Sequence, residues 1–354
     1  NPYITLFNEL IKAGAKNELP DISLAYENWV SQFEQVKLID DLTPLIQEDQ
    51  QLKDYIENLF PVFKQAIYIN NKILSIPYNK SIYVFYYNKK YINDLDLRDF
   101  NFDEFVKYLE DIKSRINKPP LYLEPNEDTF IIMYLLIYKK DFFKIENNEV
   151  EPFFLPEEVK NVINTLKKLE SQGLIKFTGN SVKDFLNNEA PIILSTSSRY
   201  VDFVNNRNNI GISSLPAKEG YIHVAGTNLA IFSKDPIKTK ASIEFIKFLL
   251  KEPNLTYMVI NTGYVPTTDK LKNYQEYKNY LEMNPEYQKV LDYSMDKLYI
   301  QPQIWAWENF RWYLNETMFN TISNNSDLNE ESLKFYSKVI QIISNQNLVK
   351  DYIK

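Results

Sequence analysis

The chain has 354 residues, 44% of them hydrophobic, and a formal net charge of −7, which suits a globular protein of two or three domain-sized units. The acidic balance argues against nucleic-acid binding, because a phosphate backbone would be repelled. The chain lacks cysteine, which excludes disulfides, cysteine metal sites and thiol nucleophiles. Its single histidine, His223, cannot build a zinc site from several histidines.

The first third of the chain predicts a turn followed by a buried strand over residues 19–26. Residues 66–78 are typical of a hairpin, with Asn70-Asn71 as its turn pair. Residues 81–87 are β-branched and aromatic, which favours another strand.

Helices dominate afterwards. Asn101 and Glu104 have the spacing of a capping box that starts a helix, and Asp235-Pro236 has the pattern of a cap followed by a first helical residue. The expected helices cover residues 102–116, 130–138, 156–173, 181–188, 236–251 (stopped by Pro253) and nearly all of the chain from 276 onward, with a buried strand over 191–196. Since strands alternate with helices, the fold class is α/β.

The segment from Gly226 to Pro266 holds two of only seven glycines, Gly226 and Gly263, one near each end. A chain that uses glycine so sparingly is expected to keep it where the backbone is left-handed or closely approached. We expect one amphipathic helix between the two corners. The pattern indicates two chain crossings at a cleft between two lobes.

An enzyme is the first functional alternative. Paired carboxylates can hydrolyse glycosides, and the available acids are Asp21, Glu27, Glu124, Glu127 and Asp128. Their spacing gives no reason to pair any two, so solvated acids and helix caps are the better interpretation. The chain contains no Walker loop, no Gly-x-Gly-x-x-Gly and no Gly-x-Ser-x-Gly. We therefore expect a protein that is not an enzyme and that has no cofactor.

Binding is the second alternative. Several expected strands end in short polar or aromatic clusters, where ligands bind in open α/β sheets. These clusters are residues 26–29, 79–81, 195–200 and 226–228. Their amides, hydroxyls and carboxylates can donate to and accept from a polyhydroxylated ligand, and aromatic faces can cover the C–H face of a sugar ring. Ordinary caps and turns are the competing interpretation of each cluster.

Four stretches in this order resemble one known family. They are Leu19-Pro20-Asp21-Ile22 with Tyr26, residues 76–81 followed by Tyr86-Tyr87-Asn88, Gly226-Thr227-Asn228, and residues 262–266. The chain resembles the family 1 extracellular solute-binding proteins of ABC transporters, which include maltose-binding and glycerol-3-phosphate-binding proteins. It departs from them at the start, because the family's first strand, helix and second strand are missing. We expect that residues before Asn1 have been removed or are not included.

The resemblance implies a type II periplasmic-binding-protein fold, with two lobes, several hinge crossings and a helical C-terminal region. Lobe one would comprise residues 1–80 and 228–264, and lobe two residues 85–225 and 265–354. The ligand would be captured in the inter-lobe cleft by hinge closure.

The expected ligand-binding residues stand at family-like cleft positions or in neighbouring polar loops. They are Tyr26, Glu27, Asn79, Ser81, Glu124, Asn126, Ser197, Ser198, Arg199, Gly226, Thr227, Asn228, Tyr264, Trp305 and Trp307. Arg199 in a serine-rich loop favours a polar or anionic ligand group, with a surface ion pair as the alternative. Of the two tryptophans we expect one in the core and Trp305 stacking on a sugar.

The resulting hypothesis is an extracytoplasmic binding protein that delivers a carbohydrate to an ABC permease. The alternatives are a ligand such as glycerol 3-phosphate, a glycoside-cleaving enzyme, and a structural surface protein without a small ligand. We expect a monomer that is periplasmic or extracellular, either free or held by a lipid anchor in the missing N-terminus. The longest apolar stretch, residues 130–138, is too short to span a bilayer.

Overall fold

The computed structural model describes residues 2–69, 71–146, 149–206 and 209–352. The chain divides into two compact units. Unit 1 comprises Asn1–Ser81, Ala225–Met283 and Ile300–Trp307, and unit 2 comprises Ile82–Val224, Asn284–Tyr299 and Glu308–Lys354. Two strands, β4 (Ile76–Asn88) and β11 (Ile222–Ile231), and helix α15 (Ala306–Met318) continue from one unit into the other.

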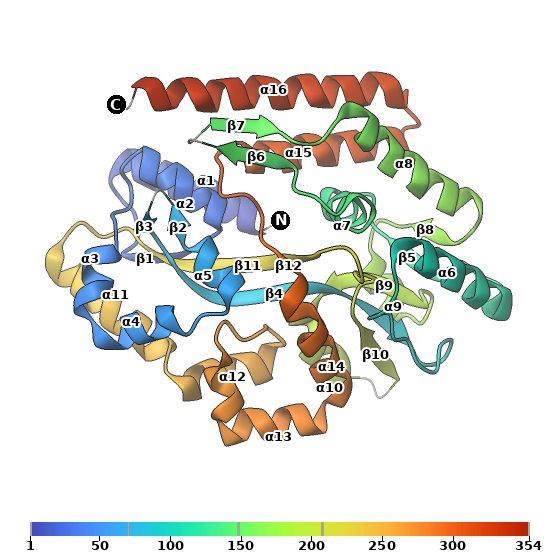
Figure 1. Ribbon diagram of the computed structural model, residues 1–354, viewed down its shortest axis with the longest axis horizontal. Coiled ribbons are helices and arrows are strands. Elements are labelled where there is room, and N and C mark those ends of the chain that lie inside the picture. Colours follow the sequence, from blue (N-terminus) through green and yellow to red (C-terminus); the bar gives the residue numbers. More distant parts are fainter. Residues whose placement is uncertain (1, 70, 147–148, 207–208, 353–354) are drawn as a thin grey trace. The chain divides into compact units, whose positions relative to one another are not determined.

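Unit 1 places helices on a small sheet (Figure 1). Its further elements are α1 (Pro2–Lys16), β1 (Ile22–Ala25), α2 (Glu27–Gln35), α3 (Thr43–Glu48), α4 (Gln50–Glu57), α5 (Pro61–Ala66), β2 (Tyr68–Ile69), β3 (Lys72–Ile73), α11 (Pro236–Leu249), α12 (Glu252–Thr262), a 3-10 turn η2 (Asp269–Asn273) and α13 (Gln275–Met283).

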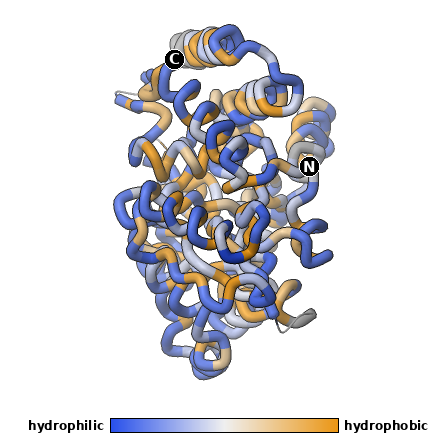
Figure 2. Tube along the Cα trace, turned by 90° about the vertical axis from the view of Figure 1, so that its right-hand side faces the viewer, coloured by the Kyte–Doolittle hydropathy of each residue, from blue (hydrophilic) through white to orange (hydrophobic). Residues whose placement is uncertain are grey.

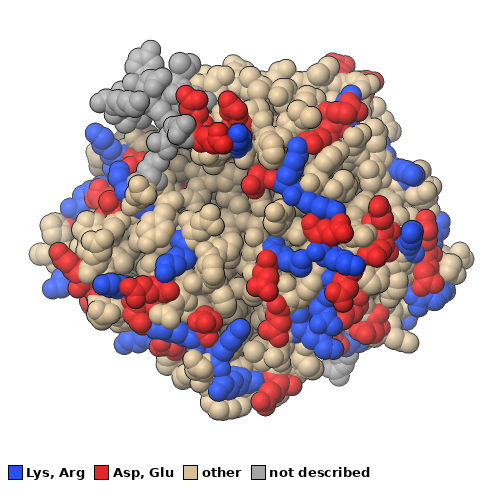
Figure 3. All heavy atoms as spheres, viewed as in Figure 1, with Lys and Arg blue, Asp and Glu red and all other residues tan. Residues whose placement is uncertain are grey.

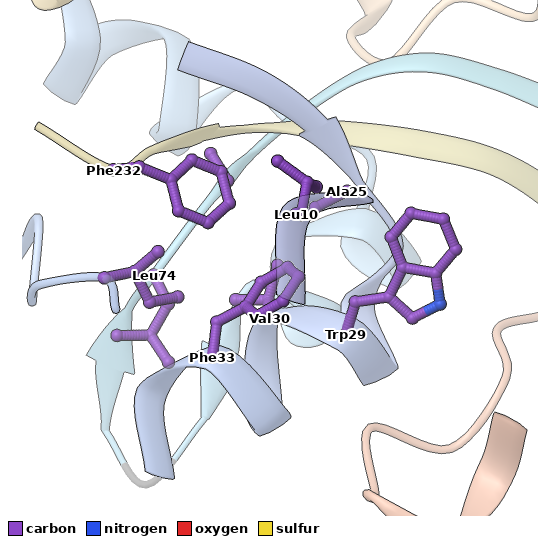
Figure 4. Packing of buried hydrophobic residues seen from close by; sticks show 9 residues of the cluster. Leu10, Ala25, Trp29, Val30, Phe33, Leu74 and Phe232 are labelled. Carbon is purple, nitrogen blue, oxygen red and sulfur yellow. The ribbon is translucent and has the colours of Figure 1, made fainter. Parts of the chain in front are cut away.

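The core of unit 1 lies where α1 and α2 pack on β1 and β11. β1 runs antiparallel to β11, with Ala25 opposite Asn228. Trp29 and Phe33 of α2 lie in one cluster with Phe232, which follows β11, and the Phe33 and Phe232 rings lie edge to face at 5.2 Å (Figure 4). This packing fixes the start of α2, where several of the expected site residues stand.

Unit 2 is larger and mostly helical. Its further elements are α6 (Phe102–Ile116), β5 (Leu121–Leu123), α7 (Glu127–Tyr138), β6 (Phe143–Glu146), β7 (Glu149–Pro152), α8 (Pro156–Ser171), β8 (Ile175–Phe177), α9 (Ser181–Leu186), β9 (Ile192–Thr196), η1 (Ser197–Arg199), α10 (Tyr200–Asn206), β10 (Ile210–Ser213), α14 (Pro285–Ser294), η3 (Met295–Lys297), β12 (Leu298–Tyr299), a π-helical turn η4 (Phe319–Ser323) and α16 (Leu328–Tyr352).

The sheet of unit 2 is mixed. β4 pairs antiparallel with β9 and with β10, while β5 pairs parallel with β9 and β8. The apolar helix α7 is buried over eight consecutive residues, from Thr129 to Leu136, which confirms the expected buried helix. The C-terminal helix α16 packs on α8 and β7 (Figure 1).

Local sequence signals set several helix boundaries. The capping box of Asn101 and Glu104 is confirmed, and Pro156 begins α8. The single helix expected between Gly226 and Pro266 was wrong, because two helices, α11 and α12, fill that segment. Pro253 lies in the first turn of α12, where a backbone N–H would have no partner within the helix. This proline therefore follows α11 and also helps to start α12. Of the expected turn pair, Asn71 is left-handed with φ 62°, while Asn70 lies outside the described residues.

The division into units differs from the expected lobes in two segments. Residues 265–283 and 300–307 lie in unit 1, whereas the resemblance placed them in lobe two. Hydrogen bonds explain the difference, because the Val265 N–H donates to the carbonyl of Lys80 at 2.7 Å, and the Gln301 amide donates to Asn28 at 3.1 Å. Both partners belong to unit 1.

The surface is mixed in charge. Lysine and arginine are interspersed with aspartate and glutamate over the face seen in Figure 3. Hydrophobic and hydrophilic residues alternate along the helical coils in Figure 2, the pattern of helices with one buried face. No helix in the described part of the chain is long and apolar enough to cross a membrane.

Candidate functional site

A buried ion pair lies at the centre of the expected site in unit 1. Glu27 opens α2, and its carboxylate bonds the ammonium of Lys80 on β4, with side chains only 5% and 1% exposed. The Lys80 ammonium also lies 3.5 Å from the carbonyl of Gly226 on β11. One cation therefore connects α2, β4 and β11 beneath the surface.

Next to this ion pair, side-chain amides and an indole form a series of hydrogen bonds. Gln301 donates to Asn28 at 3.1 Å, and the indole N–H of Trp307 donates to Gln301 Oε1 at 2.8 Å. Trp307 is fully buried, so it belongs to the core of unit 1. Trp305 is half-buried, and its carbonyl accepts from Gln32 at 3.4 Å. Trp305 thus keeps part of its surface free for contact, and its stacking role stays a prediction.

A second polar chain joins the expected residues of β4 and β11. The Thr227 hydroxyl donates to Asn79 Oδ1 at 2.7 Å, and Asn79 Nδ2 donates to the Tyr264 hydroxyl at 3.3 Å. Asn228 donates to Ser75 at 2.9 Å. These contacts hold Tyr264 in place through a residue from each of the two strands.

Gly226 makes this arrangement possible. Its φ is +98°, and a Cβ there would lie 2.0 Å from the carbonyl oxygen of Asn79. Only glycine combines that conformation with so close an approach of two strands. Gly263 ends α12 with φ 79°, so both glycines of the segment are left-handed, as expected.

Half-buried aromatic rings gather in the same unit. Tyr3 and Tyr26 lie edge to face at 5.2 Å, and Tyr26 packs on Trp29 at 4.9 Å. Burial, together with a hydrogen bond to Tyr264, raises the pKa of Tyr3 to about 12. Tyr3 is not among the binding residues expected from the sequence.

The serine-rich loop after β9 makes hydrogen bonds within unit 2. The Ser197 hydroxyl accepts from the Ile82 N–H at 3.2 Å, and the Ser198 and Thr196 hydroxyls share a hydrogen bond at 2.9 Å. Arg199 is exposed, and within the described part of the chain it makes no ion pair. Its role toward an anionic ligand stays untested, and so does any role of the buried Ser81.

Two further expected residues have structural partners. Glu124 accepts from the backbone and hydroxyl of Ser181 at 3.0 and 2.9 Å, at the start of α9. Asn126 caps α7 by accepting from the Thr129 N–H at 3.0 Å. These contacts position the first turn of α7, which carries two acids.

Those acids form a cluster that sequence reasoning did not assemble. One guanidinium nitrogen of Arg311 on α15 lies 3.1 Å from Glu127 and 3.1 Å from Asp128. Burial lowers the pKa of Arg311, but Asp128, Glu127 and Glu308 raise it by more, so its pKa exceeds its ordinary value. Burial, and then Asp128, raise the pKa of Glu127. The adjacent acids were visible in the sequence, but nothing there indicated that Arg311 would meet them.

The only histidine lies beside this cluster. His223 stacks on Tyr83 with ring centroids 5.5 Å apart and an interplanar angle of 11°. Burial lowers its pKa to about 4, while Asp128 raises it and Arg311 lowers it further. The imidazole is therefore neutral at pH 7.

We expect the His223 imidazole to titrate near pH 4, which its NMR signals can follow without overlap because the chain has no other histidine. Its folded pKa lies below the ordinary 6.5, so the unfolded chain takes up a proton first as pH falls. Between pH 6.5 and 4 this linkage lowers the free energy of unfolding by up to about 3 kcal/mol. His223→Phe should remove that part of the slope. An imidazole that titrates near 6.5 would contradict the burial.

Residues 2–285 match the family described as bacterial extracellular solute-binding protein. The chain belongs to that family. A search of curated protein sequences found no match.

Solved structures of low sequence identity share the fold of this solute-binding protein. The sugar-binding protein MalE from Xanthomonas citri has a TM-score of 0.82 at 14% identity, over 99% of this chain and 90% of that chain. UgpB from Mycobacterium tuberculosis, in complex with glycerophosphocholine, has 0.79 at 15%, over 97% and 88%. The cyclic alpha-maltosyl-1,6-maltose binding protein from Arthrobacter globiformis has 0.76 at 16%, over 96% and 88%. The periplasmic-binding-protein fold implied by the resemblance is thus confirmed.

Proposed function

We propose that this chain is an extracytoplasmic solute-binding protein of an ABC importer, and that its solute is a carbohydrate. The observation that carries the proposal is in unit 1, where Tyr26, Tyr264 and Trp305 are half-buried beside a network of buried amide, hydroxyl and carboxylate groups. Such sites suit a sugar, because aromatic faces cover its C–H groups while fixed polar groups meet its hydroxyls.

The remaining parts of the proposal follow from the family. The chain would work as a monomer with a membrane permease, outside the cytoplasm, with or without a lipid anchor, and would capture its solute by hinge closure. It would bind without turning over its ligand, since the family and the similar structures are binding proteins.

A polyol phosphoester is the second candidate, because one of the similar structures holds glycerophosphocholine. The charges of the site favour it less. In unit 1, Lys80 is bonded to Glu27, so a phosphate would compete with a carboxylate for this cation. Arg199 of unit 2 is exposed and makes no ion pair within the described residues, which favours a phosphate.

A melting-temperature screen tests the function. We expect at least one sugar, at a concentration about 100 times its Kd, to stabilise the protein by about 2.7 kcal/mol. The panel contains mono- and oligosaccharides, glycerol 3-phosphate and glycerophosphocholine, and chromatography checks each sample for products. Product formation would replace the binding proposal by an enzyme, and stabilisation by the phosphoesters alone would favour the second candidate.

Substitution locates the site. Trp305→Ala should weaken binding about tenfold, or about 1.4 kcal/mol, because a half-buried indole is lost from the proposed sugar contact. The matched control is Tyr257→Ala on α12, which removes an aromatic ring that is 68% exposed. Equal affinity in the two variants would exclude Trp305 from the site.

A further inference from the structure

Helix α11 of unit 1 is apolar on two sides. Its inner side buries Ile243 and Ile246 in the core. Its outer side exposes Ile237, Phe245 and Phe248, which are 80%, 51% and 53% exposed. A helix on the surface of a globular protein normally turns one apolar side to the core and a polar side to water. Packing within the fold therefore does not account for the outer apolar side of α11.

The outer apolar residues form one stripe. With 3.6 residues per turn, Ile237, Ala241, Phe245 and Phe248 lie within about a quarter of the helix circumference. Ala241 is exposed like the other three, and these four residues are called the α11 stripe below. Single apolar side chains on a surface are ordinary, whereas contiguous ones mark a site of interaction. The α11 stripe is therefore a surface on which a partner binds.

Lysines border the α11 stripe on both sides. The helical spacing places Lys238 along one edge and Lys240 and Lys251 along the other. Among the described residues, Lys240 and Lys251 form no ion pair, and Lys238 lies 3.5 Å from the half-exposed carboxylate of Asp21. The Lys251 ammonium lies 6.0 Å from the centre of the Phe248 ring. Positive charge thus flanks the apolar side chains directly.

The acidic residues of this helix do not cancel that charge. Glu244 bonds Lys247 at 3.0 Å, and Lys247 also bonds Asp49 of α4 at 2.7 Å. Asp235 caps α11 by accepting from two backbone N–H groups. From the first residue of α11 to Lys251 the chain has four lysines and one glutamate, a net charge of +3 in a protein whose net charge is −7. The partner is therefore expected to be anionic.

An anionic lipid surface matches both properties of the α11 stripe. Phenylalanine and isoleucine side chains enter the boundary between headgroups and acyl chains, while neighbouring lysines keep their ammonium groups among the headgroups. The negative potential of anionic lipids attracts such lysines. A stable protein interface takes roughly 20–30 residues from each partner, many more than the stripe and its lysines supply. A lipid surface sets no such minimum.

We infer that unit 1 binds an anionic membrane surface through the α11 stripe. Phe245 and Phe248 would enter the lipid, and Lys238, Lys240 and Lys251 would lie at the headgroups. This inference goes beyond solute binding, because it concerns the place where the protein works. Such contact would keep a solute-binding protein close to a membrane permease.

Vesicle sedimentation tests the inference with the 354-residue chain, produced without any lipid group. The vesicles consist of phosphatidylcholine alone, or of phosphatidylcholine and phosphatidylglycerol in equal parts. We expect the partition coefficient to be at least about tenfold higher for the anionic vesicles. It should fall severalfold between about 0.1 and 1 M salt, because the Debye length drops from about 10 to 3 Å. Equal partitioning into both kinds of vesicle, or binding to neither, would overturn the inference.

Variants assign the binding to the α11 stripe. Phe245→Ser combined with Phe248→Ser should lower partitioning into anionic vesicles about tenfold, because the apolar contact is lost. Lys240→Gln combined with Lys251→Gln should lower it by a similar factor, while partitioning into neutral vesicles stays within about twofold. Melting temperatures equal to that of the unmodified protein show that the variants are folded. Unchanged binding in both paired variants would overturn the inference.

The chain offers matched controls. Phe319→Ser on η4 removes a ring that is also 53% exposed, and Lys16→Gln combined with Lys53→Gln removes two exposed lysines outside the α11 stripe. Each control should stay within about twofold of the unmodified protein, and an equal loss in the controls would overturn the inference. A dimer in the absence of vesicles that Phe245→Ser with Phe248→Ser dissociates would show that a second copy covers the stripe, and would overturn it too. Sugar binding is decided separately by the melting-temperature screen.

Discussion

Replacing Gly226 by alanine is expected to lower the free energy of unfolding by about 3 kcal/mol or more. The new Cβ would lie 2.0 Å from the carbonyl oxygen of Asn79 and 2.9 Å from the Cα of Lys80, and φ is +98°. Both neighbours are backbone atoms of β4, so the strands must move apart. That movement would also weaken the bonds of Asn79 to Thr227 and Tyr264. Denaturant unfolding gives the loss directly.

The control for this substitution is Gly179→Ala. No atom lies within 4 Å of a Cβ at Gly179, and its φ is not left-handed. Alanine there should leave stability unchanged or raise it by less than about 1 kcal/mol. A Gly226→Ala protein as stable as the Gly179→Ala protein would show that β4 and β11 are not held so closely together.

Removing the ammonium of the buried ion pair has the second large effect. Lys80→Met should cost about 3–5 kcal/mol, because it leaves the Glu27 carboxylate buried without its cation. Adding Glu27→Gln to Lys80→Met should recover a large part of the loss, since no uncompensated charge then remains. Chemical denaturation of the two single variants and the double variant completes the cycle.

An exposed pair provides the comparison. Lys12 and Glu9 on α1 lie 2.8 Å apart with side chains 65% and 62% exposed, so Lys12→Met should change stability by less than about 1 kcal/mol. If Lys80→Met costs no more than Lys12→Met, the Lys80 ammonium does not hold α2, β4 and β11 together.

Local signals explain how much of the fold was predictable. Asn101 and Glu104 form their capping box, Pro156 starts α8, and the glycines at 226 and 263 are left-handed. Each of these features depends on a few neighbouring residues. The sequence did not predict helix α12, because a proline that can end one helix also favours the first turn of the next, as Pro253 does.

The site was predictable only in part, since side-chain partners come from distant parts of the chain. Glu27 and Asn79 were expected to face a ligand, and the structure gives them partners in Lys80 and Thr227. Arg311 lies more than 180 residues after Glu127 and Asp128, so no spacing rule connects them. The exposure of a side chain also depends on how distant segments pack, so the sequence did not show that Arg199 lies on the surface.

The measurement that most directly tests the central claim is titration calorimetry with the sugar that raises the melting temperature most. Solute capture predicts one sugar per chain, a Kd in the micromolar range or below, and a clear loss of affinity in Trp305→Ala but not in Tyr257→Ala. Heat that shows no saturable binding, or saturable binding that Trp305→Ala leaves unchanged, would contradict the proposed carbohydrate site in unit 1.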